Sequence, residues 1–69
     1  MKVRSIAEIG EMVREKRGAS HMDQQTAADL CNVGRRFLSE LENGKETLEI
    51  GKVLHVLTMF GLDVEIKSR

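Results

Sequence analysis

The chain has no proline, a single cysteine and no apolar run near the roughly 18 residues that a membrane span needs. One cysteine excludes an intrachain disulfide and fits a reducing compartment. The first twelve residues, MKVRSIAEIGEM, lack the long apolar core and the small-residue cleavage site of a signal peptide. The absence of proline and the 32% of charged residues are typical of a compact, mostly helical, soluble protein.

The chain is also short, at 69 residues, and its formal net charge is zero. This length is near the lower limit for one hydrophobic core, so we expect a single domain with an added constraint or an oligomer. Zero net charge counts against strong electrostatic DNA binding, which usually relies on a basic surface. The basic side chains would still form one basic face if three groups lie together: Arg14, Lys16 and Arg17; Arg35 and Arg36; and Lys45.

Capping residues and apolar periodicity predict four helices, over residues 6–18, 24–31, 35–43 and 48–60. Ser5 and Glu8 form a capping box before the first helix, and Asp23 is a good N-cap for the second. Asn32 can take the left-handed conformation that stops the second helix. Glycines at positions 18 and 61 are expected to end the first and the fourth helix.

The third predicted helix has a glycine at both ends. Gly34 can cap its start, and Gly44 can end it in a left-handed turn. Leu38 and Leu41 share one face, whereas two adjacent arginines stand at its N-terminal end. A helix this short is unstable alone in water, so the rest of the chain must hold it. The second helix of a helix-turn-helix is presented to a DNA major groove in this way.

Two other helices have recognisable packing faces. The second helix carries small residues on one side, which permit close helix approach: Ala27, Ala28 and Cys31. The fourth helix carries a stripe at helical spacing that we expect to be buried: Ile50, Val53, Leu54, Leu57 and Phe60.

The tail, residues 62–67, has a different period. Leu62, Val64 and Ile66 alternate with charged residues, which is the pattern of a half-buried strand. No other segment reads as a strand, and a lone strand leaves its backbone groups unpaired. Pairing with the same strand of a second copy, antiparallel about a two-fold axis, would satisfy them. The sequence therefore predicts a homodimer with a shared strand; the alternative is a frayed tail.

The residues give no sign of an enzyme. His21 and His55 have no cysteine or acidic partner at metal-ligand spacing. Cys31 falls on an apolar helix face, where a packing role is expected rather than that of a nucleophile or ligand. A glycine-rich phosphate loop is also missing, so we expect neither a catalytic site nor a metal or cofactor.

Residues 22–45, MDQQTAADLCNVGRRFLSELENGK, resemble the helix-turn-helix core of Xre-type regulators, the phage repressor and Cro superfamily. The matching positions are Met22, Gln24, Ala28, Cys31, Val33, Leu38, Leu41, Glu42, Asn43 and Gly44. The resemblance implies a mainly α, lambda-repressor-like domain of four helices over residues 1–69. Residues 47–67 further resemble the HipB-like antitoxin branch, in which the C-terminal strand forms an intersubunit ribbon. Two positions depart from the family: Gly34 replaces the usual Ser or Thr, and Asn32 replaces the usual Gly.

The resemblance makes the third helix the recognition helix. Arg35, Arg36 and Ser39 would face base edges, where an arginine bidentate to guanine is worth about 1–3 kcal/mol of discrimination. Glu40 would either accept from a cytosine amino group or restrain Arg36 at helical spacing. Phe37 would either touch a thymine methyl or sugar, or pack at the domain edge.

Other residues are expected to bind phosphates. Gln24, helped by Gln25, would bind a phosphate with its side chain and backbone amide at the start of the second helix. Asn43 and Lys45 would hold phosphates beyond the third helix.

The family also implies a structural ion pair in which Arg17 reaches Glu42 across the core. Removing one partner of a buried pair costs about 3–5 kcal/mol, so such a contact would be structural rather than DNA-binding. The alternative is that both residues are solvated surface charges with their own neighbours.

The leading hypothesis is a homodimeric, sequence-specific DNA-binding repressor that acts on an inverted repeat in the cytoplasm, bound at the nucleoid. The HipB-like resemblance would make it the antitoxin of a toxin–antitoxin module that represses its own operon and binds a HipA-like kinase toxin. The alternative is a protein-interaction module that has the helix-turn-helix fold but no specific DNA binding, which the zero net charge favours.

Overall fold

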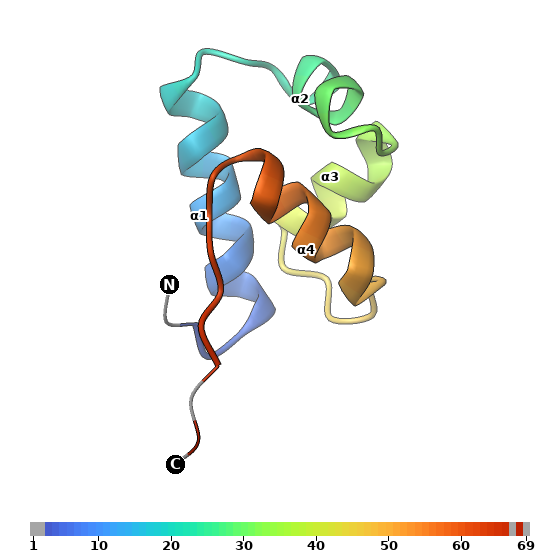
Figure 1. The fold of residues 1–69 in the computed structure, drawn as a ribbon. Helices are drawn as coiled ribbons and strands as arrows, with labels where there is room; N and C mark the ends of the chain where they lie inside the picture. Colours follow the sequence, from blue (N-terminus) through green and yellow to red (C-terminus); the bar gives the residue numbers. More distant parts are fainter. Residues whose placement is uncertain (1–2, 67, 69) are drawn as a thin grey trace.

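The computed structural model describes residues 3–66 and 68, and its chain folds into four α-helices (Figure 1). The helices are α1 (Ile6–Ala19), α2 (Gln24–Cys31), α3 (Arg35–Glu42) and α4 (Ile50–Met59). Two of the expected N-caps are in place. The Ser5 hydroxyl accepts a hydrogen bond from the amide of Glu8 at 3.3 Å, and the Asp23 carboxylate accepts one from the amide of Thr26 at 2.7 Å.

Each helix ends in the same way, with one residue in the left-handed conformation. The following amide then donates to the carbonyl five residues earlier, which satisfies an otherwise unpaired helix end. The left-handed residues are His21 (φ 56°), Asn32 (φ 56°), Gly44 (φ 78°) and Gly61 (φ 71°). The corresponding hydrogen bonds run from Met22 to Arg17, Val33 to Ala28, Lys45 to Glu40 and Leu62 to Leu57, at 2.8–3.2 Å.

The left-handed turns predicted at Asn32 and Gly44 are therefore confirmed. The prediction that Gly18 ends the first helix is wrong, because α1 continues to Ala19 and the left-handed residue is His21. At Gly18, a Cβ would meet nothing within 4 Å, so neither packing nor a turn requires glycine there.

The core lies where α1, α3 and α4 meet α2. The most deeply buried side chains include Val13, Ala27, Ala28, Cys31, Leu38, Leu41, Val53, Val56 and Leu57. The small face predicted for α2 is confirmed as buried. A second close approach involves α1 and the end of α3, because a Cβ on Gly10 would overlap the carbonyl oxygen of Leu41 and lie 2.9 Å from that of Glu42.

The stripe predicted for α4 is only partly correct. Val53 and Leu57 are buried as expected and Phe60 is half-buried, but Ile50 is 64% exposed and Leu54 45% exposed. Leu54 lies about 100° around the helix from Val53, on the side that faces solvent, whereas Val56 lies on the other side of the stripe and is buried. α4 begins at Ile50 rather than at residue 48, and the half-buried Leu48 packs against the core just before the helix.

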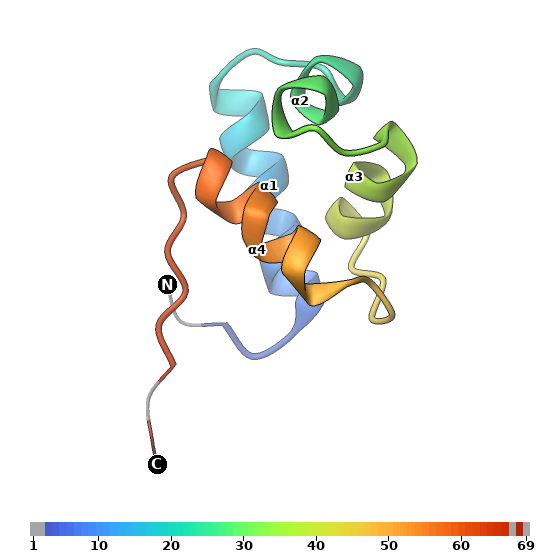
Figure 2. The ribbon, with the colours of Figure 1, turned by 45° about the vertical axis from the view of Figure 1, so that its right-hand side comes forward.

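The tail returns alongside α1 after α4 (Figures 1 and 2). Leu62 and Val64 pack partly against the core, whereas Asp63 and Glu65 are exposed. This arrangement accounts for the alternation of apolar and charged residues over 62–65, whereas Ile66 is exposed. The strand expected over 62–67 does not form within 62–66, and Lys67 lies outside the described residues, so the shared strand stays a prediction.

Candidate nucleic-acid interface

α3 is anchored by two leucines and exposes two arginines. Leu38 and Leu41 have no exposed surface, whereas Arg35 and Arg36 on the first turn are exposed. Gly34 stands at the N-cap in extended conformation (φ −70°, ψ 148°) without a side-chain hydrogen bond. Figure 2 shows α3 at the edge of the molecule, next to α2. The helix therefore has a fixed inner face and an outer face that is free to meet a ligand.

The C-terminal end of α3 is tied to α1 through Glu42, whose side chain has no exposed surface. Arg17 donates from Nε to Oε2 at 2.7 Å and from Nη2 to Oε1 at 2.9 Å. Gln24 also donates to Oε1, at 3.1 Å. The structure thus contains the Arg17–Glu42 ion pair that the family resemblance implies, and adds the first residue of α2 to it.

Glu42 is charged in this setting although it is buried. Burial opposes ionisation, but hydrogen bonds from Arg17 and Gln24 and the nearby charges of Arg17 and Arg14 hold its pKa below the usual range. The hydrogen bond with Glu42 also raises the pKa of Arg17, so both partners are ionised at neutral pH. Their burial is tolerated because the polar atoms of the pair are hydrogen-bonded.

Arg14 is a site residue that the sequence alone did not identify as a partner of α3. Its Nη2 donates to the Asn43 side-chain oxygen at 3.2 Å, and its Nε lies 3.6 Å from Glu42 Oε1. Arg14 is three residues before Arg17 and therefore on the same side of α1. That spacing was the only available signal, because Asn43 is 29 residues away in the chain.

The two glutamines assigned to phosphate binding lie at the start of α2 and already have partners. Gln24 is half-buried and gives one amide hydrogen to Glu42, which leaves its second amide hydrogen for another acceptor. Gln25 is exposed and donates to Asp29 one turn later, at 2.9 Å. Gln24 is therefore the better positioned of the two for a phosphate.

Glu40 connects α3 to the turn that follows it. Lys45 Nζ lies 2.7 Å from Oε2 of Glu40, and Arg36 Nε lies 3.8 Å from the same oxygen. The hydrogen bond from Lys45, followed by the charges of Lys45 and Arg36, holds the pKa of Glu40 below its usual range although burial acts in the opposite direction. Ser39 is half-buried on the same helix.

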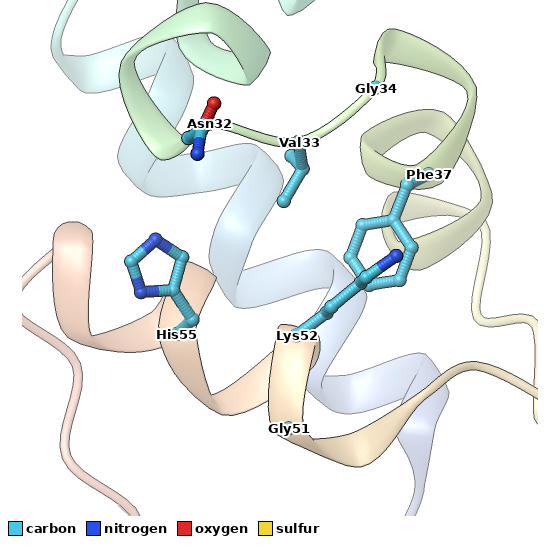
Figure 3. A pocket seen from close by; sticks show the side chains of 7 residues that line it. All are labelled: Asn32, Val33, Gly34, Phe37, Gly51, Lys52 and His55. Atoms are coloured by element: carbon cyan, nitrogen blue, oxygen red, sulfur yellow. The ribbon is translucent and has the colours of Figure 1, made fainter.

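Phe37 packs toward α4 rather than pointing outward with the arginines. Its ring lies 5.9 Å from the ammonium of Lys52, which is close enough for a cation–π contact (Figure 3). The ring lines an open hollow of about 480 Å³ between the α2–α3 turn and α4, together with Asn32, Val33, Gly34, Gly51, Lys52 and His55. On the opposite wall, His55 Nε2 is 2.9 Å from the Cys31 carbonyl oxygen. This geometry favours the packing role for Phe37.

Five of the six basic side chains that were expected to gather lie along α3. The contacts of Arg14, Arg17 and Lys45 bring the end of α1 and the α3–α4 turn to the helix that carries Arg35 and Arg36. Lys16 is separate, because it lines hollows beside Leu30 and Leu62. A neutral chain thus has a surface rich in cations, although several of them are paired with acidic side chains.

Other kinds of site are not apparent in residues 3–66 and 68. They contain no group of three or more His, Cys, Asp or Glu side chains that could hold a metal ion. Among the same residues, none of the helices has the length and apolarity to cross a membrane.

The comparison with known proteins agrees with this arrangement. No protein-family model matches the chain. An uncharacterised HTH-type transcriptional regulator of Sinorhizobium fredii, y4mF, is 40% identical over 65 residues, which span 94% of this chain and 86% of that protein. The chain belongs to the HTH-type transcriptional regulators.

Two solved structures share the fold of this regulator. One, described as MDT protein, superposes with a TM-score of 0.82 at 15% identity, over 99% of this chain and 96% of that one. The other is the restriction-modification controller protein C.AhdI from Aeromonas hydrophila, with a TM-score of 0.69 at 24% identity and 84% of both chains covered. At these identities the likeness concerns the fold alone.

Proposed function

We propose that this regulator is a sequence-specific DNA-binding repressor that acts as a homodimer on an inverted repeat. The observation that carries the proposal is the presentation of α3, which buries Leu38 and Leu41 and exposes Arg35 and Arg36 on its first turn. An exposed first turn with two arginines suits the major groove, where an arginine can bind guanine O6 and N7 together.

Residues around the C-terminal end of α3 supply the phosphate contacts in this proposal. Gln24, with a spare amide hydrogen, reaches Glu42 at that end, and Asn43 and Lys45 follow Glu42 in the chain. Phosphate contacts fix the register and orientation of a recognition helix on the duplex. Ser39 then completes the base-facing surface with the two arginines, and Glu40 either accepts from a cytosine amino group or restrains Arg36.

The homodimer rests on the tail. Leu62 and Val64 lie against the core, whereas Ile66 is 94% exposed at the end of the same alternating segment. Antiparallel pairing of 62–67 with a second copy would cover Ile66 and satisfy the backbone groups of both tails. Two-fold symmetry would place two α3 helices in successive major grooves, about 34 Å apart.

A narrower proposal concerns the biological setting. The resemblance of residues 47–67 to the HipB-like branch supports an antitoxin that represses its own operon and binds a HipA-like kinase toxin in the cytoplasm. Copurification with the product of a neighbouring kinase gene would support this setting, whereas a gene with no adjacent kinase would count against it.

The competing function is a protein-interaction module that has kept the fold and lost specific DNA binding. The zero net charge and the ion pairs of Arg17, Arg36 and Lys45 favour it. Salt dependence separates the two functions, because a DNA binder loses affinity with a log–log slope of about −0.9 for each phosphate it neutralises.

The decisive experiment measures binding to a duplex that the parent protein selects from a random-sequence pool, and to a shuffled duplex. Arg35→Ala and Arg36→Ala should each lose most of the preference for the selected duplex. Lys16→Ala is the matched control, because Lys16 is an exposed cation on α1 that lines hollows beside Leu30 and Leu62 and is separate from the basic groups along α3. If the parent prefers no sequence, or if both α3 variants behave like the control, the recognition helix is wrongly assigned.

A further inference from the structure

One carboxylate oxygen of Glu40 lies between two of the cations assigned to DNA. Lys45 Nζ lies 2.7 Å from Oε2 of Glu40, and Arg36 Nε lies 3.8 Å from the same oxygen. The Glu40 side chain is 28% exposed. Arg36, at 90% exposed, is otherwise surrounded by solvent. A single negative charge on the recognition helix is therefore shared by a base-reading arginine and a phosphate-binding lysine.

The position of Lys45 is set by the fold and not only by its flexible side chain. Its backbone amide donates to the Glu40 carbonyl at 3.0 Å, as part of the turn around Gly44 (φ 78°). Its ammonium then returns to the carboxylate of the same residue. Because the backbone bond fixes where the lysine begins, the ion pair forms at low conformational cost compared with an ordinary surface pair.

The contact with Arg36 has a different geometry. The closest approach of Glu40 is to Nε of the guanidinium, and neither terminal nitrogen is hydrogen-bonded to this carboxylate. Those two nitrogens are the ones that bind guanine O6 and N7 in an end-on bidentate contact. Arg36 can therefore read a guanine while it remains beside Glu40. Lys45 instead gives one of its three N–H donors to Glu40, and the carboxylate neutralises the charge that would attract a phosphate.

We propose that Glu40 is a specificity-determining residue that weakens non-specific binding by holding Lys45, while it orients Arg36 toward a guanine. The proposal rests on the DNA-binding function proposed above. Non-specific binding depends almost wholly on phosphate contacts, so the Lys45 pair subtracts from it directly. A guanine under Arg36 restores affinity through a contact that a phosphate backbone cannot offer.

The test compares Glu40→Gln with Glu15→Gln, since both variants change the formal net charge from zero to +1. Glu15 is exposed on α1 and lines the hollow beside Leu62, on the side away from the contacts of Arg14 and Arg17 with α3. The probes are the duplex selected by the parent protein and its shuffled form, titrated at several salt concentrations. Thermal melting of both variants checks that they are folded.

For Glu40→Gln we expect tighter binding to the shuffled duplex, with a salt slope steeper by about one unit because Lys45 becomes available for a phosphate. The preference for the selected duplex should fall about tenfold as Arg36 loses its orientation, within the range known for one bidentate contact. Glu15→Gln should change both affinities alike and leave the preference intact.

Two results would overturn the inference while leaving DNA binding in place. One is a Glu40→Gln variant that matches Glu15→Gln on both duplexes. The other is loss of binding to the selected duplex with no gain on the shuffled one, which would make Glu40 a direct acceptor from a base. A parent protein that binds neither duplex would instead refute the proposed function itself.

Discussion

Arg17 and Glu42 are joined by two nearly parallel hydrogen bonds, from Nε and Nη2 to the two carboxylate oxygens. The remaining nitrogen of the guanidinium donates to the Met22 carbonyl at 2.9 Å. One arginine on α1 thus holds the end of α3 and the segment that leads into α2. This contact therefore helps to fix the orientation of α3 relative to α1 and α2.

Glu42→Gln should lower the free energy of unfolding by about 3 kcal/mol, because it leaves the mostly buried guanidinium of Arg17 without its counter-charge. Chemical denaturation followed by circular dichroism measures this loss. The control is Glu15→Gln, an exposed carboxylate on α1, which should change stability by no more than about 0.5 kcal/mol. Equal stability of the two variants would show that the Glu42 network contributes nothing to folding.

The same carboxylate should make stability depend on pH. The pKa of Glu42 is lower in the folded chain than in the unfolded one, so its contribution is complete above the ordinary carboxyl pKa. This contribution is lost as the pH falls through the pKa of Glu42 in the folded chain, because the unfolded chain binds the proton more readily. Asp23 and Glu40 also have lowered pKa values and add to the decline.

The contribution of Glu42 is therefore measured as a difference between two titrations of stability. The parent protein should lose more stability than Glu42→Gln between neutral and acid pH, and the two curves should converge at low pH. Parallel curves would mean that the charge of Glu42 is not coupled to folding.

The helix boundaries were predictable because they depend on local chemistry. Ser5 and Asp23 cap α1 and α2 within three residues of themselves, and Asn32 and Gly44 tolerate the left-handed conformation that ends a helix. Such features need no knowledge of the rest of the chain. His21 was missed because the nearby Gly18 is a stronger signal for that conformation than a histidine.

The features that were not predictable depend on how distant segments meet. Arg14 reaches Asn43 across 29 residues, and the exposure of Leu54 depends on which side of α4 the other helices cover. Helical periodicity shows that a stripe exists, but Leu54 and Val56 border it on opposite sides, and only the packing of the other helices decides which of the two is buried. The Arg17–Glu42 pair was anticipated only through the family resemblance.

Gly10 should be the least replaceable glycine in a helix of this chain. A Cβ there would overlap the Leu41 carbonyl oxygen, which is backbone and cannot move aside without shifting α3 from α1. Gly10→Ala should therefore destabilise the fold by about 1–3 kcal/mol in thermal or chemical denaturation. Gly51→Ala in α4 is the matched control. Its Cβ would meet nothing within 4 Å, so it should gain about 0.5–1 kcal/mol from helix propensity.

The two glycine variants are informative as a pair because the expected changes in stability have opposite signs. A stabilising Gly10→Ala would contradict the close approach of α1 and α3. A destabilising Gly51→Ala would mean that the hollow beside Phe37 is less open than its lining residues indicate.

If residues 62–67 pair with the same segment of a second copy, the oligomeric state should depend on them. Truncation after Leu62 should give monomers in sedimentation velocity, and it should weaken binding to an inverted repeat because two half-sites are no longer bound together.

Ile66→Asp tests the same contact without removing Val64 from the core. Ile66 is 94% exposed in the single chain, so its replacement should leave melting of the monomer unchanged and lower dimer affinity. A truncated chain that remains dimeric would place the dimer contact elsewhere, and the exposed Ile50 and Leu54 of α4 would then be the next residues to replace.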